Sequence, residues 1–383
     1  MCFLVFHAMV KILSMGAEGG SGMDKENRRE RTKRFRLAQT KKLMRARERH
    51  NHRIQRRKRN DKKHGLQYVA PRVRRARLRP QTYKLVAPVE LDICNKSNET
   101  VSFFGNVIHT IKQCNWEDTL HFDLSAVECI STDAVMYLIA IIKNMRRVRT
   151  YRIECKGNMP KNAEARGILE KAGFYSYVES PAARRLKSDE RFMKISVGKD
   201  ADARLASSFC DFVQAKCDKS ILETKRLYSM LIELMTNTHQ HAYKANEQGI
   251  MLQNWYVSAY ATELGVRCVF LDTGVGIPAT VSKKAAEKML DLIFTNDAMY
   301  LKSALLGDFR SETREGHRGK GIPGIYEDAC DYSISNLCIV SGKGKCYVDG
   351  SNIKDEKLNQ HFEGTLFSWD IMSKRKGGLH GHY

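Results

Sequence analysis

The first half of the folded part of the chain alternates between strand-like and helix-like patterns. Thr119–Leu124 alternates apolar and polar residues with a period of two, which predicts a half-buried strand. Asp133–Met145 is apolar on most sides and predicts a buried helix. Tyr151–Cys155 predicts a second strand, and Asn162–Ala172 predicts a helix that ends before Gly173. This order of strand, helix, strand and helix predicts parallel pairing through right-handed crossovers.

The second half of the chain combines helices with strands that follow one another closely. The pattern predicts helices at 203–218, 221–243 and 325–330, and strands at 251–260, 266–271, 333–340, 345–348 and from Gly364 onward. The second helix carries apolar residues at i, i+3 and i+4 spacing: Leu227, Met230, Leu231, Leu234 and Met235. Helices segregated from a mostly antiparallel sheet predict an α+β two-layer sandwich, whereas the first half is predicted to be α/β.

The charge of the chain is concentrated near its start. Residues 24–79 hold 24 Lys and Arg against five Asp and Glu, while the whole chain carries a net charge of +22. So little apolar surface and so much charge predict that residues 1–80 form a disordered basic tail when free. Nucleic acid or another polyanion is the partner that such a tail favours, through salt-dependent phosphate contacts. A merely solubilising tail is the alternative interpretation.

Cysteine usage and hydropathy indicate the compartment. The chain has 11 cysteines and no CxxC pair, which argues against a zinc ribbon and against a disulfide framework, so a reduced cytoplasm is expected. No apolar run approaches the roughly 20 residues that a membrane span requires. Residues 1–10 are apolar, which leaves two interpretations: a secretory signal, or a start codon assigned upstream of Met15 or Met23.

The predicted helix at 221–243 carries polar residues that suit a nucleotide site. Glu233 and Asn237 are four residues apart and lie on one face, and His241 follows a turn later. The Asn237 side-chain oxygen suits Mg²⁺, and Glu233 could accept a proton from a nucleophile near a phosphate. An amphipathic helix that simply turns polar residues to water is the alternative.

Two glycine loops follow this helix. The first begins with Asp272 at the end of an apolar strand and continues through Gly274, Gly276 and Ile277. A carboxylate there can accept a hydrogen bond from an exocyclic amine, and the glycines let the backbone approach a ring closely. The second loop precedes a helix and contains Arg318, Gly319, Lys320 and Gly321. Its N–H groups and positive charge suit a phosphate.

The ordered set of motifs resembles a known family. Glu233 to His241, Asp272-x-Gly-x-Gly, Gly319-x-Gly321 and Gly364-Thr365 follow one another as the four boxes of the GHKL ATPases do, the superfamily of gyrase and the histidine kinases. The Asn-x-x-x-His-Ala sequence is most similar to the anti-sigma-factor serine kinases. The resemblance covers about residues 200–372 and implies the Bergerat ATPase fold.

That resemblance implies roles for individual residues. Glu233 would be the general base, Asn237 the Mg²⁺ ligand and Asp272 the adenine anchor. The residues lining the ATP would be Asn237, His241, Asp272, Gly274, Gly276, Ile277, Arg318, Gly319, Lys320, Gly321 and Thr365. Residues 280–318 would form the ATP lid. The kinases carry an Arg just before the second glycine box, a place that falls near His317 and Arg318 here.

Residues 84–195 resemble the STAS domain of anti-sigma-factor antagonists. The segment Phe122 to Ala134 has a strand, a turn and Ser131-Thr132-Asp133 at a helix start, where the family carries a phosphorylated serine. The phosphoacceptor position falls on Asp133, which would mimic phosphate or cap the helix. Phosphotransfer to Ser131 or Thr132 is a further alternative. The resemblance implies a protein partner for this domain.

Together these features predict a basic tail (1–80), a STAS-like α/β domain (84–195), a histidine-kinase-like ATPase domain (200–374) and a flexible end (375–383). The predicted function is a cytoplasmic Mg-ATP-binding regulatory switch or serine/threonine protein kinase-like protein. Two alternatives stay open: nucleic-acid binding by the tail with the ATPase as a gate, and a nucleotide-responsive scaffold without turnover. Neither phosphorylation target nor oligomeric state follows from the sequence.

Overall fold

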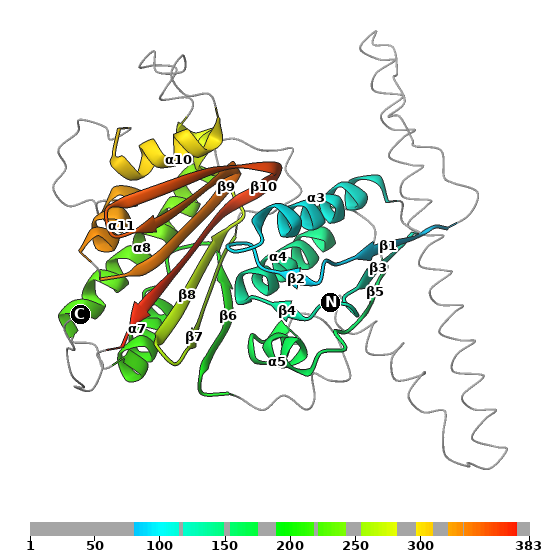
Figure 1. Cartoon of the computed structure of the whole chain (residues 1–383), viewed down its shortest axis with the longest axis horizontal. Coiled ribbons are helices and arrows are strands. Elements are labelled where there is room, and N and C mark those ends of the chain that lie inside the picture. Colours follow the sequence, from blue (N-terminus) through cyan, green and yellow to red (C-terminus); the bar gives the residue numbers. More distant parts are fainter. Residues whose placement is uncertain are drawn as a thin grey trace, which may run out of the picture. The chain divides into compact units, whose positions relative to one another are not determined.

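A computed structural model describes residues 80–114, 118–148, 154–174, 189–217, 221–242, 254–281, 296–308, 321–331 and 333–373. All of them belong to one compact unit that starts at Arg79. The basic segment 24–79 and the C-terminal residues 375–383 lie outside the described residues. The described chain has mixed α/β content (Figure 1). None of its helices combines the length and apolarity that crossing a membrane requires, as far as the described residues extend.

The described residues of the first half form short parallel strands and three helices. In chain order these are β1 (Thr82–Val86), β2 (Glu90–Leu91), α3 (Ser97–Gln113), β3 (Thr119–Asp123), β4 (Cys129–Ile130), α4 (Thr132–Val148), β5 (Glu154–Asn158) and α5 (Ala163–Lys171). Strands β1, β3 and β5 form one sheet in that order, and β2 pairs with β4. Every pair is parallel, and the pairing of β3 with β5 is the one that the alternation of strands and helices predicts.

Three elements of this half can be compared with their sequence predictions. Helix α3 was not among the predicted elements, although its buried residues Val101, Phe104, Val107, Ile108 and Ile111 follow helical spacing. Strand β5 is paired with β3 from Glu154, and the first three residues of the predicted strand, 151–153, lie outside the described residues. The predicted start of α5 is confirmed, because the Asn162 side chain accepts hydrogen bonds from the N–H groups of Glu164 and Ala165.

The second half contains one five-stranded sheet and four helices among its described residues. They are β6 (Phe192–Gly198), α7 (Ala203–Cys217), α8 (Ile221–Ala242), β7 (Trp255–Ala261), β8 (Gly265–Asp272), α10 (Asp297–Leu306), α11 (Gly321–Cys330), β9 (Ser335–Asp349) and β10 (Asn352–Met372). The strand order is β6-β7-β8-β10-β9, and all neighbours are antiparallel. Strand β6 extends to Gly198, beyond the boundary predicted at 195.

The last two strands are longer than predicted. Strand β9 is continuous where two short strands were predicted, and β10 begins at Asn352 instead of Gly364. The first part of β10 is mostly exposed and polar, so it lacks the apolar signal of a strand. Its pairing with β9 across the turn at Gly350 maintains it, as in a β-hairpin.

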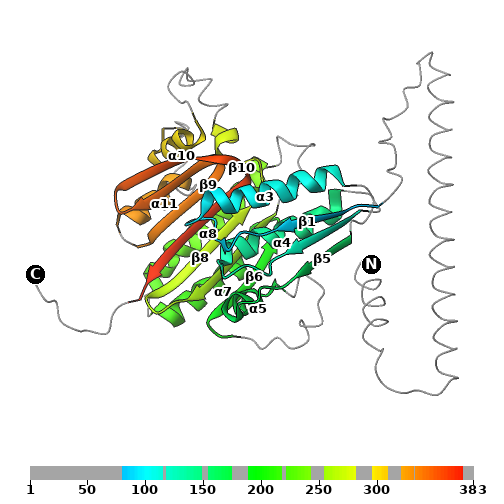
Figure 2. The ribbon, with the colours of Figure 1, turned by 45° about the vertical axis from the view of Figure 1, so that its right-hand side comes forward.

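Alternate residues of the five-stranded sheet belong to two separate buried clusters. On one face, Tyr256, Val269, Leu271, Val340 and Leu366 share a cluster with the first half of the chain, including α3 and α4. The opposite face includes Trp255, Val257, Phe270, Ile339 and Phe367, which pack with residues of α7, α8, α10 and α11. Figure 2 shows α3 passing beside β10. The sheet is therefore the middle layer of one packed unit.

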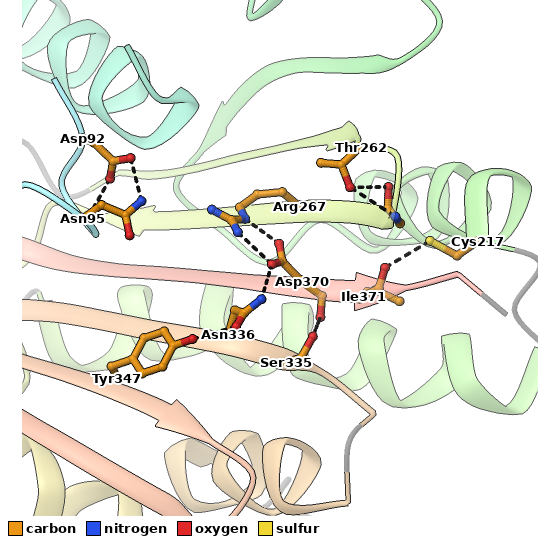
Figure 3. A network of polar contacts seen from close by, with 11 residues as sticks. Asp92, Asn95, Cys217, Thr262, Arg267, Ser335, Asn336, Tyr347, Asp370 and Ile371 are labelled. Atoms are coloured by element: carbon orange, nitrogen blue, oxygen red, sulfur yellow. Dashed lines mark hydrogen bonds and ion pairs between the residues drawn. The ribbon is translucent and has the colours of Figure 1, made fainter. Parts of the chain in front are cut away.

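A polar network joins the three strands β8, β10 and β9 (Figure 3). Arg267 of β8 forms a two-pronged ion pair with Asp370 of β10, in which Nη2 lies 2.7 Å from Oδ2. The Asn336 side-chain amide of β9 donates to the same carboxylate over 2.8 Å. Because Arg267 and Asp370 are also register partners, the pair fixes the alignment of these two strands.

Candidate functional site

Asp272, the last residue of β8, is the acidic centre of the candidate site. Its Oδ1 accepts a hydrogen bond of 2.8 Å from the N–H of Gly274. Thr365 lies directly opposite on β10, and its hydroxyl also bonds to the carboxylate. Burial raises the pKa of Asp272 to about 6, although these two hydrogen bonds oppose the shift. The carboxylate is thus held in place while partly removed from water.

The loop after Asp272 is fixed by one buried hydroxyl, that of Ser341 on β9. The N–H of Ile277 donates to Ser341 Oγ over 3.0 Å, and Ser341 Oγ donates to the carbonyl of Gly364 over 2.8 Å. Thr365 Oγ1 lies 3.1 Å from the same oxygen. Gly276 has a φ of +86°, and a Cβ there would lie 2.7 Å from Ser341 Oγ. Glycine is therefore required at 276 by both conformation and space.

We expect Ser341→Ala to lower the free energy of unfolding by about 1–3 kcal/mol, because the buried Ile277 N–H and Gly364 carbonyl lose their partner. Urea unfolding of the full chain measures this loss. Ser351→Ala, at an exposed turn position, is the matched control and should change stability by less than about 0.5 kcal/mol. Equal stability of the two variants would contradict the assigned role of Ser341.

The helix α8 presents Glu233 and Asn237 on one half-buried face, while Leu234 and Met235 enter the core. Gly321 opens α11 with a φ of +62°, and a Cβ there would lie 3.6 Å from Glu233 Oε1. The structure therefore brings the Glu233 carboxylate beside the first residue of α11. A helix N-terminus beside an acid–base group suits a phosphate and its nucleophile.

The two halves of the candidate site are connected through the core. Ile277 from the loop after Asp272 lies in the same buried cluster as Leu234 of α8 and Ile325 of α11. The loop after Asp272 and the helices α8 and α11 are thus packed into one cluster.

Several predicted residues lie beyond the described part of the site. Arg318, Gly319 and Lys320 fall in the undescribed segment 309–320, and the side chain of His241 is also undescribed. Of the predicted lid at 280–318, residues 280–281 and 296–308 are described, and the second range contains α10. Buried Leu301 and Leu305 anchor this helix in the core, so that part of the predicted lid is a packed element.

The predicted metal ligand, Asn237, is not a His, Cys, Asp or Glu residue. No group of three or more His, Cys, Asp or Glu able to hold a metal ion occurs among the described residues. The predicted Mg²⁺ ligand is the amide oxygen of Asn237, which is not one of those residue types. Asn237 is half-buried next to the Glu233 turn of α8.

The start of α4 holds the residues predicted for phosphate mimicry, capping or phosphotransfer. Asp133 is only 4% exposed, accepts from the N–H of Ala134 over 2.6 Å and contacts the Ser131 hydroxyl. Ser131 Oγ also donates to the carbonyl of Leu91 over 3.2 Å. Burial, and secondly the charge of Asp92, raise the pKa of Asp133 to about 6. The capping position belongs to Ser131, which precedes α4 and accepts from the N–H of Ala134 over 3.5 Å, whereas Asp133 is the second residue of the helix.

Sequence reasoning missed Ser341 and Thr273, both of which bind the loop after Asp272. Thr273 Oγ1 accepts from the N–H of Asn254 over 3.1 Å and so connects the loop to the residue before β7. A polar residue inside an otherwise apolar strand, as in Ile339-Val340-Ser341, was the available signal for Ser341. Its partners depend on strand register, which the sequence pattern does not supply.

Comparison with known proteins gives no further guide to the site. No protein-family model matches the chain, and no curated protein matches it. What the site can bind follows from its residues.

Proposed function

We propose that residues 200–374 bind Mg-ATP as a GHKL-type ATPase domain, and that the chain is an ATP-dependent regulatory switch or serine/threonine protein kinase-like protein with a STAS-like first half. The observation that carries this proposal is the environment of Asp272. Its carboxylate is half-buried at the end of β8, is fixed by Gly274 and Thr365, and lies beside a tight glycine loop.

The residues present fit the adenine end of a nucleotide. A carboxylate has about four acceptor positions, and the two bonds to Gly274 and Thr365 leave capacity for an exocyclic amine. Partial burial strengthens such a hydrogen bond and disfavours competing water. Gly274 and Gly276 keep the backbone beside the carboxylate free of side chains, so that a flat ring can approach.

The residues also fit the phosphate end. Gly321 begins α11, whose first N–H groups and positive dipole end favour an anion. Asn237 would hold Mg²⁺ by its side-chain oxygen, and bound Mg²⁺ supplies charge neutralisation at phosphate oxygens. Glu233, beside Gly321, would accept the proton of an attacking hydroxyl or water. Arg318 and Lys320 precede α11 in sequence and would add positive charge.

The substitution Asp272→Asn tests whether the Asp272 carboxylate binds adenine. Asparagine keeps the shape but replaces an acceptor oxygen with a donor, so affinity for ATP should fall about 10- to 100-fold. Adenosine affinity of the wild type should rise between about pH 5 and pH 7, as Asp272 ionises around its pKa of about 6, and the variant should show no such rise. Adenosine is preferred for this pH series because a terminal phosphate itself titrates near pH 6.

The free energy of unfolding is a second measurement for Asp272→Asn, and it should increase where the affinity for ATP decreases. The pKa of Asp272 in the fold exceeds its ordinary value of 3.8, so the charged form costs folding free energy. This cost is absent below about pH 4 and grows as pH rises toward the pKa of about 6. Asp272→Asn should therefore be more stable than wild type at about pH 7 to 8, by about 1–3 kcal/mol. Calorimetric binding by the variant at wild-type affinity would refute the adenine-anchor role.

A further inference from the structure

The strands β9 and β10 lose their regular pairing next to the candidate nucleotide site. Phe362 of β10 is paired with Gly342, but Thr365 is paired with Ser341, the next residue along β9. Glu363 and Gly364 therefore fall between two consecutive partners and form a bulge. Bulges of this kind re-aim neighbouring side chains and are frequent beside active sites.

Two side-chain hydroxyls bind the backbone of this bulge. Ser341 donates to the carbonyl of Gly364. The hydroxyl of Tyr137, from α4 in the first half of the chain, donates to the carbonyl of Glu363 and accepts from its N–H, both over 3.1 Å. Tyr137 thus replaces both hydrogen bonds that a partner strand would supply to Glu363.

The ring of Tyr137 is held by two aromatic contacts. It is 1% exposed, stacks on Phe362 at a centroid distance of 4.3 Å, and meets the edge of Phe104 of α3 at 5.0 Å. With aromatic contacts on two sides, the ring has little room to change rotamer. The position of α4 is therefore transmitted to the peptide groups of Glu363.

Glu363 is two residues from Thr365, whose hydroxyl bonds to Asp272 and lies 3.1 Å from Ser341. Gly364, between them, passes so close to Asp272 that a Cβ would lie 2.1 Å from the Asp272 carbonyl oxygen. A shift of the bulge would therefore displace both the backbone and the hydroxyl that hold the candidate adenine anchor.

We propose that Tyr137 is a positioning residue of the nucleotide site, through which helix α4 sets the bulge at Glu363–Gly364 and thereby the placement of Thr365 against Asp272. This inference rests on the proposed function. Through these contacts, a movement of α4 in the first half of the chain would change the position of Thr365 at the site. By linkage, any partner that shifts α4 would change nucleotide affinity, and nucleotide would change the affinity for that partner by the same factor.

Tyr137→Phe in the full chain tests the proposal. The variant keeps the ring and removes the hydroxyl, and we expect its affinity for adenosine and for ATP to fall by the same factor, about three- to tenfold, in calorimetry. Ser258→Ala is the matched control. It also removes a buried hydroxyl bonded to a backbone carbonyl, that of Met193, but on β7, away from the bulge. The control should lose stability and keep wild-type affinity.

A second readout separates positioning from simple core packing. If the Thr365 hydroxyl leaves Asp272, the hydrogen bond that lowers the carboxyl pKa weakens, so the midpoint of the pH-dependent adenosine affinity should move upward in Tyr137→Phe. A destabilised variant with wild-type affinity and an unchanged midpoint would overturn the proposal. Should Tyr137→Phe not fold, Phe362→Leu perturbs the same ring, and wild-type affinity in that variant would overturn it equally.

Failure of the proposed function gives a different result. Wild-type protein that binds neither adenosine nor ATP would refute the nucleotide site itself. The pH dependence of unfolding, compared with that of Asp272→Asn, still reports the Asp272 pKa without any ligand. An upward shift of that pKa in Tyr137→Phe would support the positioning role independently, and no shift would contradict it.

Discussion

Replacing Gly364 with alanine is expected to destabilise the fold by about 2–5 kcal/mol, because backbone strain and overpacking each cost about 1–3 kcal/mol. Gly364 has a φ of +109°, and a Cβ there would lie 2.1 Å from the carbonyl oxygen of Asp272. The atom in the way belongs to the backbone, so it cannot rotate aside. The midpoint of urea unfolding measures the effect, and an unchanged slope shows that the unfolding transition is comparable.

Gly167→Ala is the control for this substitution. Gly167 lies in α5, and a Cβ added there would meet no other atom within 4 Å. Alanine in a helix is favoured over glycine by about 0.5–1 kcal/mol, so this variant should be stabilised. Equal stability of Gly364→Ala and wild type would mean that β10 does not approach Asp272 in the way described.

Glu233→Gln is expected to lower turnover about 10²- to 10⁴-fold, the range that general acid–base groups contribute, if the chain hydrolyses ATP or transfers its phosphoryl group. Glutamine has the size of glutamate and preserves packing against Gly321, so ATP affinity should remain near that of the wild type. Single-turnover assays together with calorimetry measure the two quantities separately.

Neighbouring variants sharpen this test. Asn237→Ala, on the same face of α8, should remove the part of ATP affinity that depends on Mg²⁺, whereas Glu233→Gln should not. Glu263→Gln, at an exposed loop position, is the neutral control. Equally slow turnover by wild type and Glu233→Gln would contradict the general-base role and favour the scaffold without turnover.

The elements with strong periodic patterns were predictable from the sequence. The stripe on α8 and the apolar run that ends at Asp272 correctly placed Glu233, Asn237 and Asp272 on a helix and at a strand end. Asn162 identified the start of α5 because a helix cap is a local interaction. The parallel pairing of β3 with β5 followed from the alternation of strands and helices, whereas β1 was not predicted.

What the sequence did not reveal depends on register and on distant contacts. The exposed first part of β10 has no alternating pattern, and it is held by pairing with β9 and by hydrogen bonds with Asn98 of α3. Ser341 and Tyr137 are polar groups among apolar neighbours, and their partners at Ile277 and Glu363 lie 64 and 226 positions away in the chain. No local pattern encodes such pairings.

The use of both faces of the five-stranded sheet has a practical consequence. A recombinant fragment limited to residues 200–374 would lack α3, α4 and β6, and would expose Tyr256, Val269, Leu271, Val340 and Leu366 to solvent. An exposed apolar sheet face promotes self-association. Insolubility of that fragment would therefore reflect a missing layer of its core, and the region from residue 79 onward is the sensible unit for expression.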